Sequence, residues 1–320
     1  MKKLGILTSG GDAPGMNPVI RAVVRTASKE GIEVVGIRRG FDGLLSGDTI
    51  ELDGRSVSNI TNQGGTILFS ARSEEMKTDE GSKRAYEMAK ILGFDALVVI
   101  GGDGSLTGAK VLSEHGLTVM GIPGTIDLDL DCSEYTIGFD TAVNTGMDAI
   151  NRIRDTTASH ERVSVVEVMG RDCGYLAIWC ALAAGADDVM VPEVTEIDVD
   201  AVIRQILTNR SRGKKHNLVV VAEGVGRTQE LADRIATITG ISSRATILGH
   251  LQRGGSPTAI DRVHGSEMGM LAVDLLLRGE KNRVMIRRDG RYIHIDIAEA
   301  LNHKREFDRS LYDSVRQLSF

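Results

Sequence analysis

The sequence predicts an α/β fold made of two Rossmann-like, three-layer domains with mainly parallel sheets. Short apolar runs alternate with helix-like segments along the chain, which is typical of buried parallel strands joined by helical crossovers. Several of these runs end abruptly in glycine-rich turns that carry polar residues. The same order restarts near residues 138–140 without a low-complexity linker. A length of 320 residues also suggests about two domains.

Composition indicates a cytoplasmic enzyme. The chain is 42% hydrophobic, 26% charged and 4% aromatic, which is ordinary for a globular α/β protein. A net charge of −6 argues against broad nucleic-acid binding. The apolar run at residues 4–7 is too short for a signal peptide, and no stretch is long enough to cross a membrane. The cysteines are few, odd in number and not in CxxC pairs, so free thiols in a reducing compartment are expected.

The first half of the chain contains four expected strands and three expected helices, the last of them a helix-like segment between residues 105 and 117. Asn17 is expected to cap the first helix, with Pro18 as its first residue. That helix carries Arg21 and Arg25 on one face. The strands are predicted at 4–7, 33–37, 96–100 and 117–122, and the second helix at 78–92.

The second half repeats this order. A terminal hairpin is expected over 284–296, turned at Asp289 and Gly290. Strands are predicted at 163–168, 189–191 and 218–222, and helices at 141–154, 175–184, 199–208, 229–239 and 266–277.

The stretch over residues 96–131 carries the strongest chemical signal. Its first strand ends in Gly101-Gly102-Asp103-Gly104-Ser105. Glycines let a phosphate approach the backbone, and the following helix N-terminus favours negative charge. An aspartate among phosphates indicates a cation between them, so Asp103 suggests Mg²⁺. The alternative is a tight turn in which Asp103 only caps the helix.

Residues 125–129 follow the next strand. If this segment is extended, Thr125, Asp127 and Asp129 lie on one face. Two carboxylates beside a phosphate site suggest one general base and one metal-associated group. A solvated acidic loop is the alternative, since further acids follow closely.

Other predicted strand ends carry glycine with arginine or glutamate. A second glycine-rich turn occupies residues 8–15. Cationic turns beside a phosphate site fit a second phosphorylated ligand, because arginine binds phosphate in a bidentate manner. Each residue alone is more often structural, and the basic run at 210–216 would by default be a solvated charge run. The residues at these strand ends are Arg72, Arg171, Glu223 and Arg253.

Together these motifs resemble the bacterial ATP-dependent 6-phosphofructokinase family over essentially the full chain. The matching segments are LTSGGDAPGMN, GGT, SAR, VVIGGDGS, GIPGTID, YTIGFDTA, VEVMGRDCG, VVAEG and LGHLQRGGSPTAIDR. The resemblance implies an allosteric, glycolytic kinase that transfers the γ-phosphoryl group of ATP, its co-substrate, to the 1-hydroxyl of fructose 6-phosphate with Mg²⁺. It also implies a homotetramer, with the active site in the cleft between the two domains of each chain.

The resemblance also assigns the domains and residues. The ATP-binding domain is expected at 1–138 plus 252–304, and the fructose 6-phosphate-binding domain at 139–251 plus 305–320. Asp127 is the implied base, with Thr125, Arg72, Arg171 and Gly11 also catalytic, and Asp103 and Asp129 as metal residues. The ATP-binding residues are Gly11, Arg72, Ser73, Gly102, Asp103, Gly104 and Ser105. The sugar-binding residues are Thr125, Asp127, Asp129, Met169, Gly170, Arg171, Glu223, His250 and Arg253, together with Arg162 and Arg244 from a neighbouring subunit.

An effector pocket for ADP or phosphoenolpyruvate carries over in part. Asp187 stands where the family usually has glutamate, so we expect phosphoenolpyruvate to inhibit and ADP to activate weakly. Glycine at 104 and 124, where pyrophosphate-dependent relatives usually carry Asp and Lys, favours ATP as donor. The effector residues are Arg21, Arg25, Arg154, Gly185, Asp187, Arg212, Lys214 and His216.

Two departures keep rival functions open. Leu128 replaces an amide in the family's TIDND strip, and Tyr175 replaces an aspartate after the GRxxG turn. These changes motivate a catalytically weak, nucleotide-binding sensor as one alternative. An NAD-kinase-like enzyme also uses a GGDG turn, but it leaves Arg162, Arg244 and Arg253 without a role.

Overall fold

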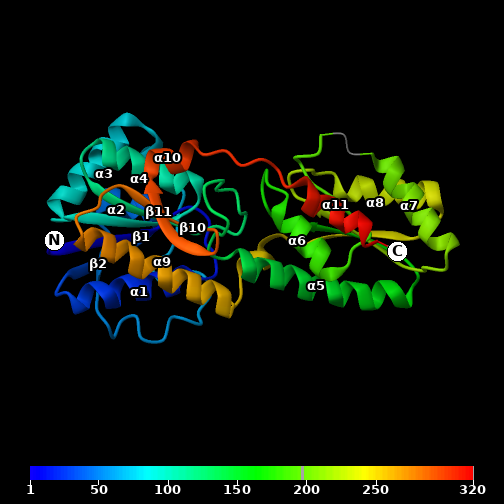
Figure 1. Cartoon of the computed structure of the whole chain (residues 1–320), viewed down its shortest axis with the longest axis horizontal. Helices are drawn as coiled ribbons and strands as arrows, with labels where there is room; N and C mark the ends of the chain where they lie inside the picture. The colour runs from blue at the N-terminus through cyan, green and yellow to red at the C-terminus, as the bar shows by residue number, and fades with distance from the viewer. Residues whose placement is uncertain (196–197, 320) are drawn as a thin grey trace. The chain divides into compact units, whose positions relative to one another are not determined.

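A computed structural model describes residues 1–195 and 198–319. The chain divides into two compact units, which are considered separately. Unit 1 comprises Met1–Thr141 and Arg253–Arg305, and unit 2 comprises Ala142–Gln252 and Glu306–Phe320. Helix α5 (Phe139–Ser159) begins in unit 1 and continues in unit 2 (Figure 1).

Unit 1 is built on a seven-stranded sheet with the order β11-β10-β5-β4-β1-β2-β3. The five central strands run parallel, and the edge strands β3 and β11 are antiparallel to their neighbours. The strands are β1 (Lys3–Thr8), β2 (Glu33–Ile37), β3 (Thr49–Leu52), β4 (Ala96–Gly101), β5 (Thr118–Pro123), β10 (Arg283–Arg288) and β11 (Arg291–Asp296).

Helices cover both faces of this sheet. Helices α1 (Met16–Lys29) and α9 (Ala259–Leu277) pack together on one face (Figure 1). Leu97 and Val99 pack on the other face with side chains of the remaining helices. Because side chains alternate along a strand, Val98 and Ile100 face the opposite layer. The remaining helical segments are α2 (Gly40–Ser46), η1 (Glu75–Lys77), α3 (Asp79–Ile91), α4 (Asp103–Glu114) and α10 (Ile297–Asn302).

Unit 2 has a parallel four-stranded sheet with the order β7-β8-β6-β9. Its core joins Val163, Val165, Val219 and Val221 of the strands to apolar residues of the helices. The strands are β6 (Val163–Val168), β7 (Asp188–Met190), β8 (Asn217–Ala222) and β9 (Ser243–Ile247). The helical segments are α6 (Tyr175–Ala184), α7 (Val199–Ser211), α8 (Thr228–Thr239), η2 (Gly249–Arg253) and α11 (Arg309–Gln317).

The expected terminal hairpin is confirmed. Strands β10 and β11 pair up to Arg288 opposite Arg291, leaving Asp289 and Gly290 as a two-residue turn. Both turn residues have positive φ, 50° and 71°, which is the conformation that twists a tight hairpin correctly.

The predicted role of Asn17 as a helix cap is wrong. Helix α1 already begins at Met16, and Gly15 is its N-cap without a side-chain hydrogen bond. The Asn17 side chain instead donates to the Gln63 carbonyl at 3.0 Å and accepts from the Ile67 amide at 2.8 Å. Asn17 therefore fastens the loop over residues 63–67 to α1.

Two further findings concern the chain as a whole. Within residues 1–195 and 198–319, no helix combines the length and apolar character that crossing a membrane requires. The three cysteines, Cys132, Cys173 and Cys180, are free thiols.

Candidate active site

Three glycine-containing turns meet at one edge of the unit 1 sheet. They follow β1, β4 and β5, which are neighbouring parallel strands, so their carboxyl ends lie at the same edge. Backbone hydrogen bonds join the turns: the Ser9 amide donates to the Ile100 carbonyl, and the Gly124 amide to the Gly101 carbonyl, both at 3.0 Å. This edge can bind a polyphosphate through backbone amides and the N-terminus of α4.

The predicted ATP-binding residues lie on this edge. Gly102 is the N-cap of α4 and has no side-chain cap, and Asp103 is exposed in the first helical turn. The alternative in which Asp103 only caps the helix is therefore wrong. A Cβ added at Gly104 would meet nothing within 4 Å, so space is open above this residue. The segment carrying Arg72 and Ser73 reaches the same edge, because the Gly10 amide donates to the Ala71 carbonyl at 3.2 Å.

Gly11 leaves room for Arg253. A Cβ at Gly11 would lie 2.4 Å from Nη1 of Arg253, which donates to the Asp12 carbonyl at 3.2 Å. The structure thus brings a predicted ATP-binding residue and a predicted sugar-binding residue together within unit 1. The Asp12 carbonyl thus holds the Arg253 guanidinium, a group suited to phosphate contacts, beside Gly11.

We expect Gly11→Ala to raise the KM for fructose 6-phosphate by about tenfold or more, because the added methyl group displaces the Arg253 guanidinium and one charge-assisted contact is worth roughly 1.5–3 kcal/mol. Steady-state kinetics at saturating ATP measure this effect. Gly54→Ala is the matched control, because a Cβ at Gly54 meets nothing within 4 Å. Equal KM values for Gly11→Ala and Gly54→Ala would contradict the packing argument.

Residues 125–129 do not form the extended strip that the sequence suggested. The Thr125 hydroxyl accepts from the Asp127 amide at 3.2 Å, which bends the chain directly after β5. Leu128 then has φ 55°, in the left-handed region. Thr125 and Asp127 are buried at 8% and 2% exposure, so they are not part of a solvated acidic loop. The prediction of three polar side chains alternating on one extended face is wrong.

A metal ion here would need ligands from a phosphate. Among the described residues, no group of three or more His, Cys, Asp or Glu side chains is arranged to hold a metal. Mg²⁺ commonly keeps several waters and uses one or two carboxylates plus substrate phosphates. The exposed carboxylate of Asp103 and the half-buried Asp129 fit this type of site.

In unit 2, Glu223 organises the turn after β6. Its Oε1 accepts from the amides of Gly170 and Arg171, at 3.2 and 2.6 Å. Gly170 has φ 136° and Arg171 has φ 53°, so this carboxylate stabilises an unusual backbone conformation. The Arg171 side chain is exposed beyond the turn. Glu223 therefore positions Arg171, in addition to any contact that Glu223 makes with a ligand.

The neighbouring residue Gln252 was missed by sequence reasoning. Its Oε1 accepts from the Met169 amide at 2.8 Å, so it fixes the start of the same turn. His250 lies nearby in η2, after the carboxyl end of β9. The only signal for Gln252 was its place in the LGHLQRGGSP segment, since a glutamine alone points to no chemistry.

Arg162 and Arg244 lie at the opposite edge of this sheet. Arg162 directly precedes β6, and Arg244 pairs with Ser164 near the amino ends of β6 and β9. The Met169–Arg171 turn follows the carboxyl end of the six-residue strand β6. At about 3.3 Å per residue, the two edges are roughly 20 Å apart. One phosphate cannot contact both groups within a single chain.

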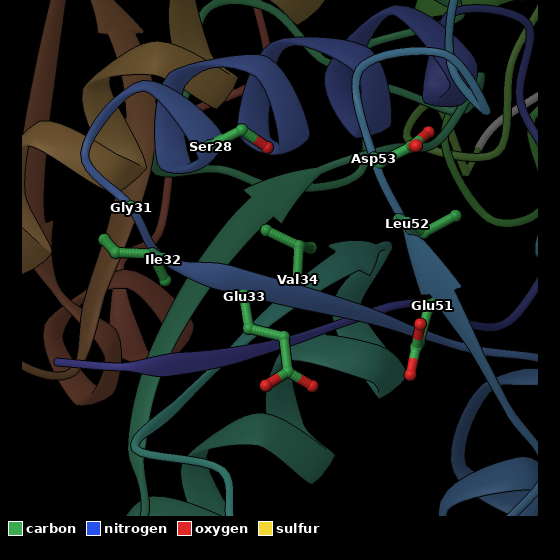
Figure 2. A pocket seen from close by; sticks show the side chains of 8 residues that line it. All are labelled: Ser28, Gly31, Ile32, Glu33, Val34, Glu51, Leu52 and Asp53. Carbon is green, nitrogen blue, oxygen red and sulfur yellow. The ribbon is translucent and has the colours of Figure 1, made fainter.

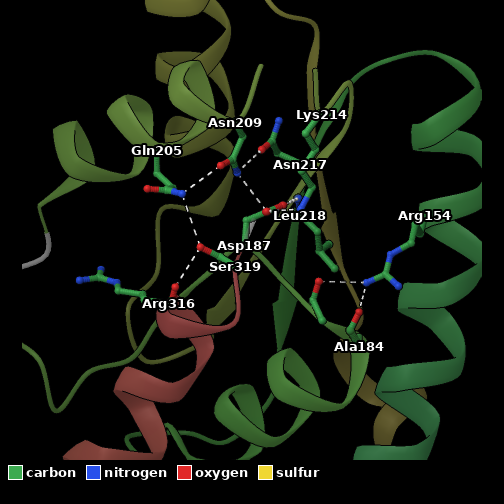
Figure 3. Close-up of polar contacts among 11 residues, drawn as sticks. Arg154, Ala184, Asp187, Gln205, Asn209, Lys214, Asn217, Leu218, Arg316 and Ser319 are labelled. Carbon is green, nitrogen blue, oxygen red and sulfur yellow. Dashed lines mark hydrogen bonds and ion pairs between the residues drawn. The ribbon is translucent and has the colours of Figure 1, made fainter. Parts of the chain in front are cut away.

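The predicted effector residues fall into two sets. Arg21 and Arg25 lie on α1 in unit 1, and their buried Nε atoms have no hydrogen-bond partner within the described part of the chain. In unit 2, Arg154 donates to the carbonyl oxygen of Ala184, next to Gly185 at the end of α6 (Figure 3). Arg212 and His216 lie close in sequence to Lys214, in the connection from α7 to β8.

Asp187 is already bound by the protein itself (Figure 3). Its Oδ1 accepts from Asn209 at 3.1 Å and forms an ion pair with Lys214, and its Oδ2 accepts from the Leu218 amide at 2.8 Å. Asp187 is 3% exposed. In this structure its charge is neutralised by Lys214, and a bound cation would have to displace that lysine.

Tyr175, one of the two departures, has a structural environment. It is 8% exposed, and its hydroxyl accepts from the Asp308 amide at 3.1 Å. Its ring also lies 6.0 Å from that of Phe307. Tyr175 thus attaches the C-terminal segment to α6.

An open groove of about 670 Å³ lies elsewhere on unit 1, between the end of α1 and strands β2 and β3 (Figure 2). It carries Glu33, Glu51 and Asp53, and Lys3 pairs with Glu33 at 3.0 Å. In the register of β1 and β2, Glu33 lies opposite Lys3, the first residue of β1. The groove therefore lies at the edge of the sheet opposite to the glycine turns. It contains none of the predicted site residues.

Two α/β units with glycine-containing turns at the carboxyl ends of parallel strands are typical of enzymes that bind phosphorylated ligands. The phosphofructokinase family model matches residues 3–276. The chain therefore belongs to the phosphofructokinase family. An ATP-dependent 6-phosphofructokinase of Clostridium tetani is 55% identical over 320 residues, covering 100% of both chains.

Solved structures of the family confirm the fold. Phosphofructokinase of Pichia pastoris in the T-state superposes with a TM-score of 0.91 at 34% identity, covering 99% of this chain and 37% of that one. Phosphofructokinase of Saccharomyces cerevisiae gives 0.89 at 32% identity, covering 100% and 47%. The chain thus spans about half or less of these yeast chains, 47% and 37%.

Proposed function

We propose that this chain is an ATP-dependent 6-phosphofructokinase that acts in glycolysis in the cytoplasm. It transfers the γ-phosphoryl group of ATP to the 1-hydroxyl of fructose 6-phosphate and releases fructose 1,6-bisphosphate and ADP. The observation that carries the proposal is the meeting of the turns at Gly11, Gly102–Ser105 and Thr125–Asp127 on adjacent strand ends. Full-length identity of 55% to a named enzyme of this activity supports it.

Unit 1 supplies the donor site and the base in this proposal. Backbone amides of the glycine turns bind the ATP phosphates, and Arg72 neutralises charge that develops during transfer. Asp127 accepts the proton of the sugar 1-hydroxyl, because a buried carboxylate at a strand end can be held in one orientation toward its substrate. The open space at Gly104 supports ATP as the donor.

Mg²⁺ would be held by Asp103, with Asp129 close to it. Bound there, the ion would neutralise negative charge on the donor phosphates. Because the described residues form no metal cluster of their own, we expect the ion to bind together with ATP rather than before it.

Unit 2 supplies the acceptor site. Met169, Gly170, Arg171, Glu223 and His250 gather at one sheet edge and bind the sugar phosphate. Arg162 and Arg244 lie at the other edge, which supports their donation to the acceptor site of a neighbouring subunit. A homotetramer is therefore the proposed assembly.

We also propose that Arg154 and Lys214 bind an anionic effector, ADP or phosphoenolpyruvate. In the double variant Arg154→Ala, Lys214→Ala, we expect the change that either ligand causes in the KM for fructose 6-phosphate to become at least about tenfold smaller. The reason is that each charge-assisted contact contributes roughly 1.5–3 kcal/mol. Saturation curves with and without each ligand measure this effect. Lys215→Ala is the matched control, since Lys215 pairs with Glu161 on the surface. A full response in the double variant would mean that the basic segment is only a solvated charge run.

The function is tested with purified protein, Mg²⁺, fructose 6-phosphate and either ATP or pyrophosphate in an assay coupled to product formation. We expect saturable turnover with ATP and none above background with pyrophosphate. Turnover with pyrophosphate alone would overturn the donor assignment, and no turnover with either donor would favour the nucleotide-binding sensor.

A further inference from the structure

Asp261 is a fully buried carboxylate at the start of α9, outside the predicted sites. Its Oδ1 accepts from the Tyr135 hydroxyl and the Gly138 amide, both at 2.6 Å. Its Oδ2 accepts from the Thr141 amide at 2.8 Å and from the Thr141 hydroxyl. These donors come from one segment that lies more than a hundred residues away in sequence, as separations of 120 to 126 residues show.

All of these donors are neutral, so these hydrogen bonds bring no positive charge to the buried carboxylate. Burial raises the pKa of Asp261, and the hydrogen bonds from Thr141, Tyr135 and Gly138 act in the opposite direction. A buried charged group is costly unless its hydrogen bonds are complete. The hydrogen bonds to this carboxylate fix the position of the segment over residues 135–141, which includes the first turn of α5.

The segment over residues 135–141 contacts two of the glycine-containing turns of unit 1, the turn after β1 and the turn after β5. Ile137 lies between two anchored residues, and its amide donates to the Pro123 carbonyl at 2.9 Å. It also forms a bridge with Gly124, the residue directly before Thr125. On its other side, a Cβ at Gly15 would lie 2.5 Å from the Ile137 side chain.

Gly138 is packed as tightly as Gly15. An added Cβ there would lie 2.7 Å from Ala13, in the turn that contains Gly11. The segment is therefore wedged between the turn after β1 and the turn after β5. A shift of residues 135–138 moves the backbone from which Thr125 and Asp127 project.

We propose that Asp261 is a positioning residue for phosphoryl transfer, which holds the segment 135–141 so that Ile137 fixes the turn carrying Thr125 and Asp127. The proposal rests on the proposed function, in which Asp127 is the base. Asp261 is fully buried and its carboxylate accepts from the segment 135–141, so it acts on the rate through the placement of that base.

Asp261→Asn tests the proposal, because it keeps the volume and removes one acceptor. We expect kcat to fall by about 10- to 100-fold with little change in either KM, since a displacement of about 1 Å of a reacting group can cost 10²-fold. Asp188→Asn is the matched control, because Asp188 is also buried, at 4% exposure, but pairs with Arg316 in unit 2. We expect this control to lose stability and keep its kcat.

A double variant separates positioning from general destabilisation. In an Asp127→Asn background the base is already absent, so adding Asp261→Asn should change kcat by less than about twofold. Multiplicative losses, or a wild-type kcat in Asp261→Asn alone, would overturn the proposal. If Asp261→Asn does not fold, Tyr135→Phe replaces it: removing one donor should lower kcat by about 2- to 10-fold, with the same non-additivity.

Amide hydrogen exchange gives a readout that does not depend on turnover. We expect Asp261→Asn to accelerate exchange at residues 124–127 and 137–141, and Asp188→Asn to leave these amides unchanged. If the wild-type chain shows no kinase turnover, the proposed function fails, and the exchange pattern still decides whether Asp261 holds this segment. Unchanged protection at residues 124–127 would contradict the positioning role.

Discussion

Asp127→Asn should lower kcat by about 10²–10⁴-fold while leaving the affinity for both substrates nearly unchanged, because a positioned general base contributes that factor to the rate. Asp127 is 2% exposed and directly follows the bend made by Thr125, so the isosteric amide fits without repacking. The side chain of the variant can still accept a hydrogen bond, but it cannot take a proton from the sugar hydroxyl.

The control for this result is Asp131→Asn, which removes a half-buried carboxylate from the same connection without touching the turn. We expect its kcat to match the wild type. Rates are measured at saturating ATP and fructose 6-phosphate, and binding is measured separately by calorimetry. A near-normal kcat in Asp127→Asn would remove Asp127 from the role of base.

Arg162→Ser and Arg244→Ser should each raise the KM for fructose 6-phosphate by about 10- to 100-fold, because a charge-assisted phosphate contact is worth roughly 1.5–3 kcal/mol. The contact exists in ground and transition states alike, so kcat should change much less. Arg278→Ser is a suitable control, because this arginine ends α9 in the other unit.

The sheet geometry of unit 2 makes a sharper test possible. Arg162 lies at the amino end of β6 and Arg171 beyond its carboxyl end, so the two cannot bind one phosphate from the same chain. Mixing Asp127→Asn chains with Arg162→Ser chains should therefore restore activity through hybrid sites, measured at a fructose 6-phosphate concentration well below the raised KM of Arg162→Ser. No recovery after verified subunit exchange would contradict a site shared between subunits.

The sequence predicted most of the strands because their apolar runs, although short, are unbroken. Strands β4 and β6 match the expected runs almost to the residue. Strand β3 was missed because three of its four residues are not buried, which leaves no apolar run to detect. Helix α11 was missed for a similar reason. Tyr312 and Val315 are its buried residues, and they do not form an apolar pattern that the sequence reveals.

The glycine turns of the site were predictable, but the backbone after β5 was not. Period-two alternation in Thr125, Asp127 and Asp129 suggested a strand, whereas a side-chain hydrogen bond to the Asp127 amide makes a bend. Leu128 has φ 55°, in the left-handed region, and asparagine, the residue expected from the family resemblance, tolerates this region better than leucine. Leu128 is 4% exposed, and its carbonyl accepts from Arg305 at 3.2 Å.

Contacts between distant segments were beyond sequence reasoning. Asp261 stands in a recognisable motif, but its partners become visible only when α9 is packed against the segment 135–141. The ion pair between Asp187 and Lys214 is another example, because the sequence offered both as ligand-binding residues and the structure pairs them with each other.

The central claim is transfer of the γ-phosphoryl group of ATP to the 1-hydroxyl of fructose 6-phosphate. It is tested most directly by comparing ADP release with fructose 6-phosphate and with its 1-deoxy analogue, which keeps the 6-phosphate but lacks the acceptor hydroxyl. We expect the analogue to compete with the sugar for binding and to support no release above the rate with ATP alone. Release at the rate seen with fructose 6-phosphate would contradict the claim, because the phosphoryl group would then go to water or to another hydroxyl.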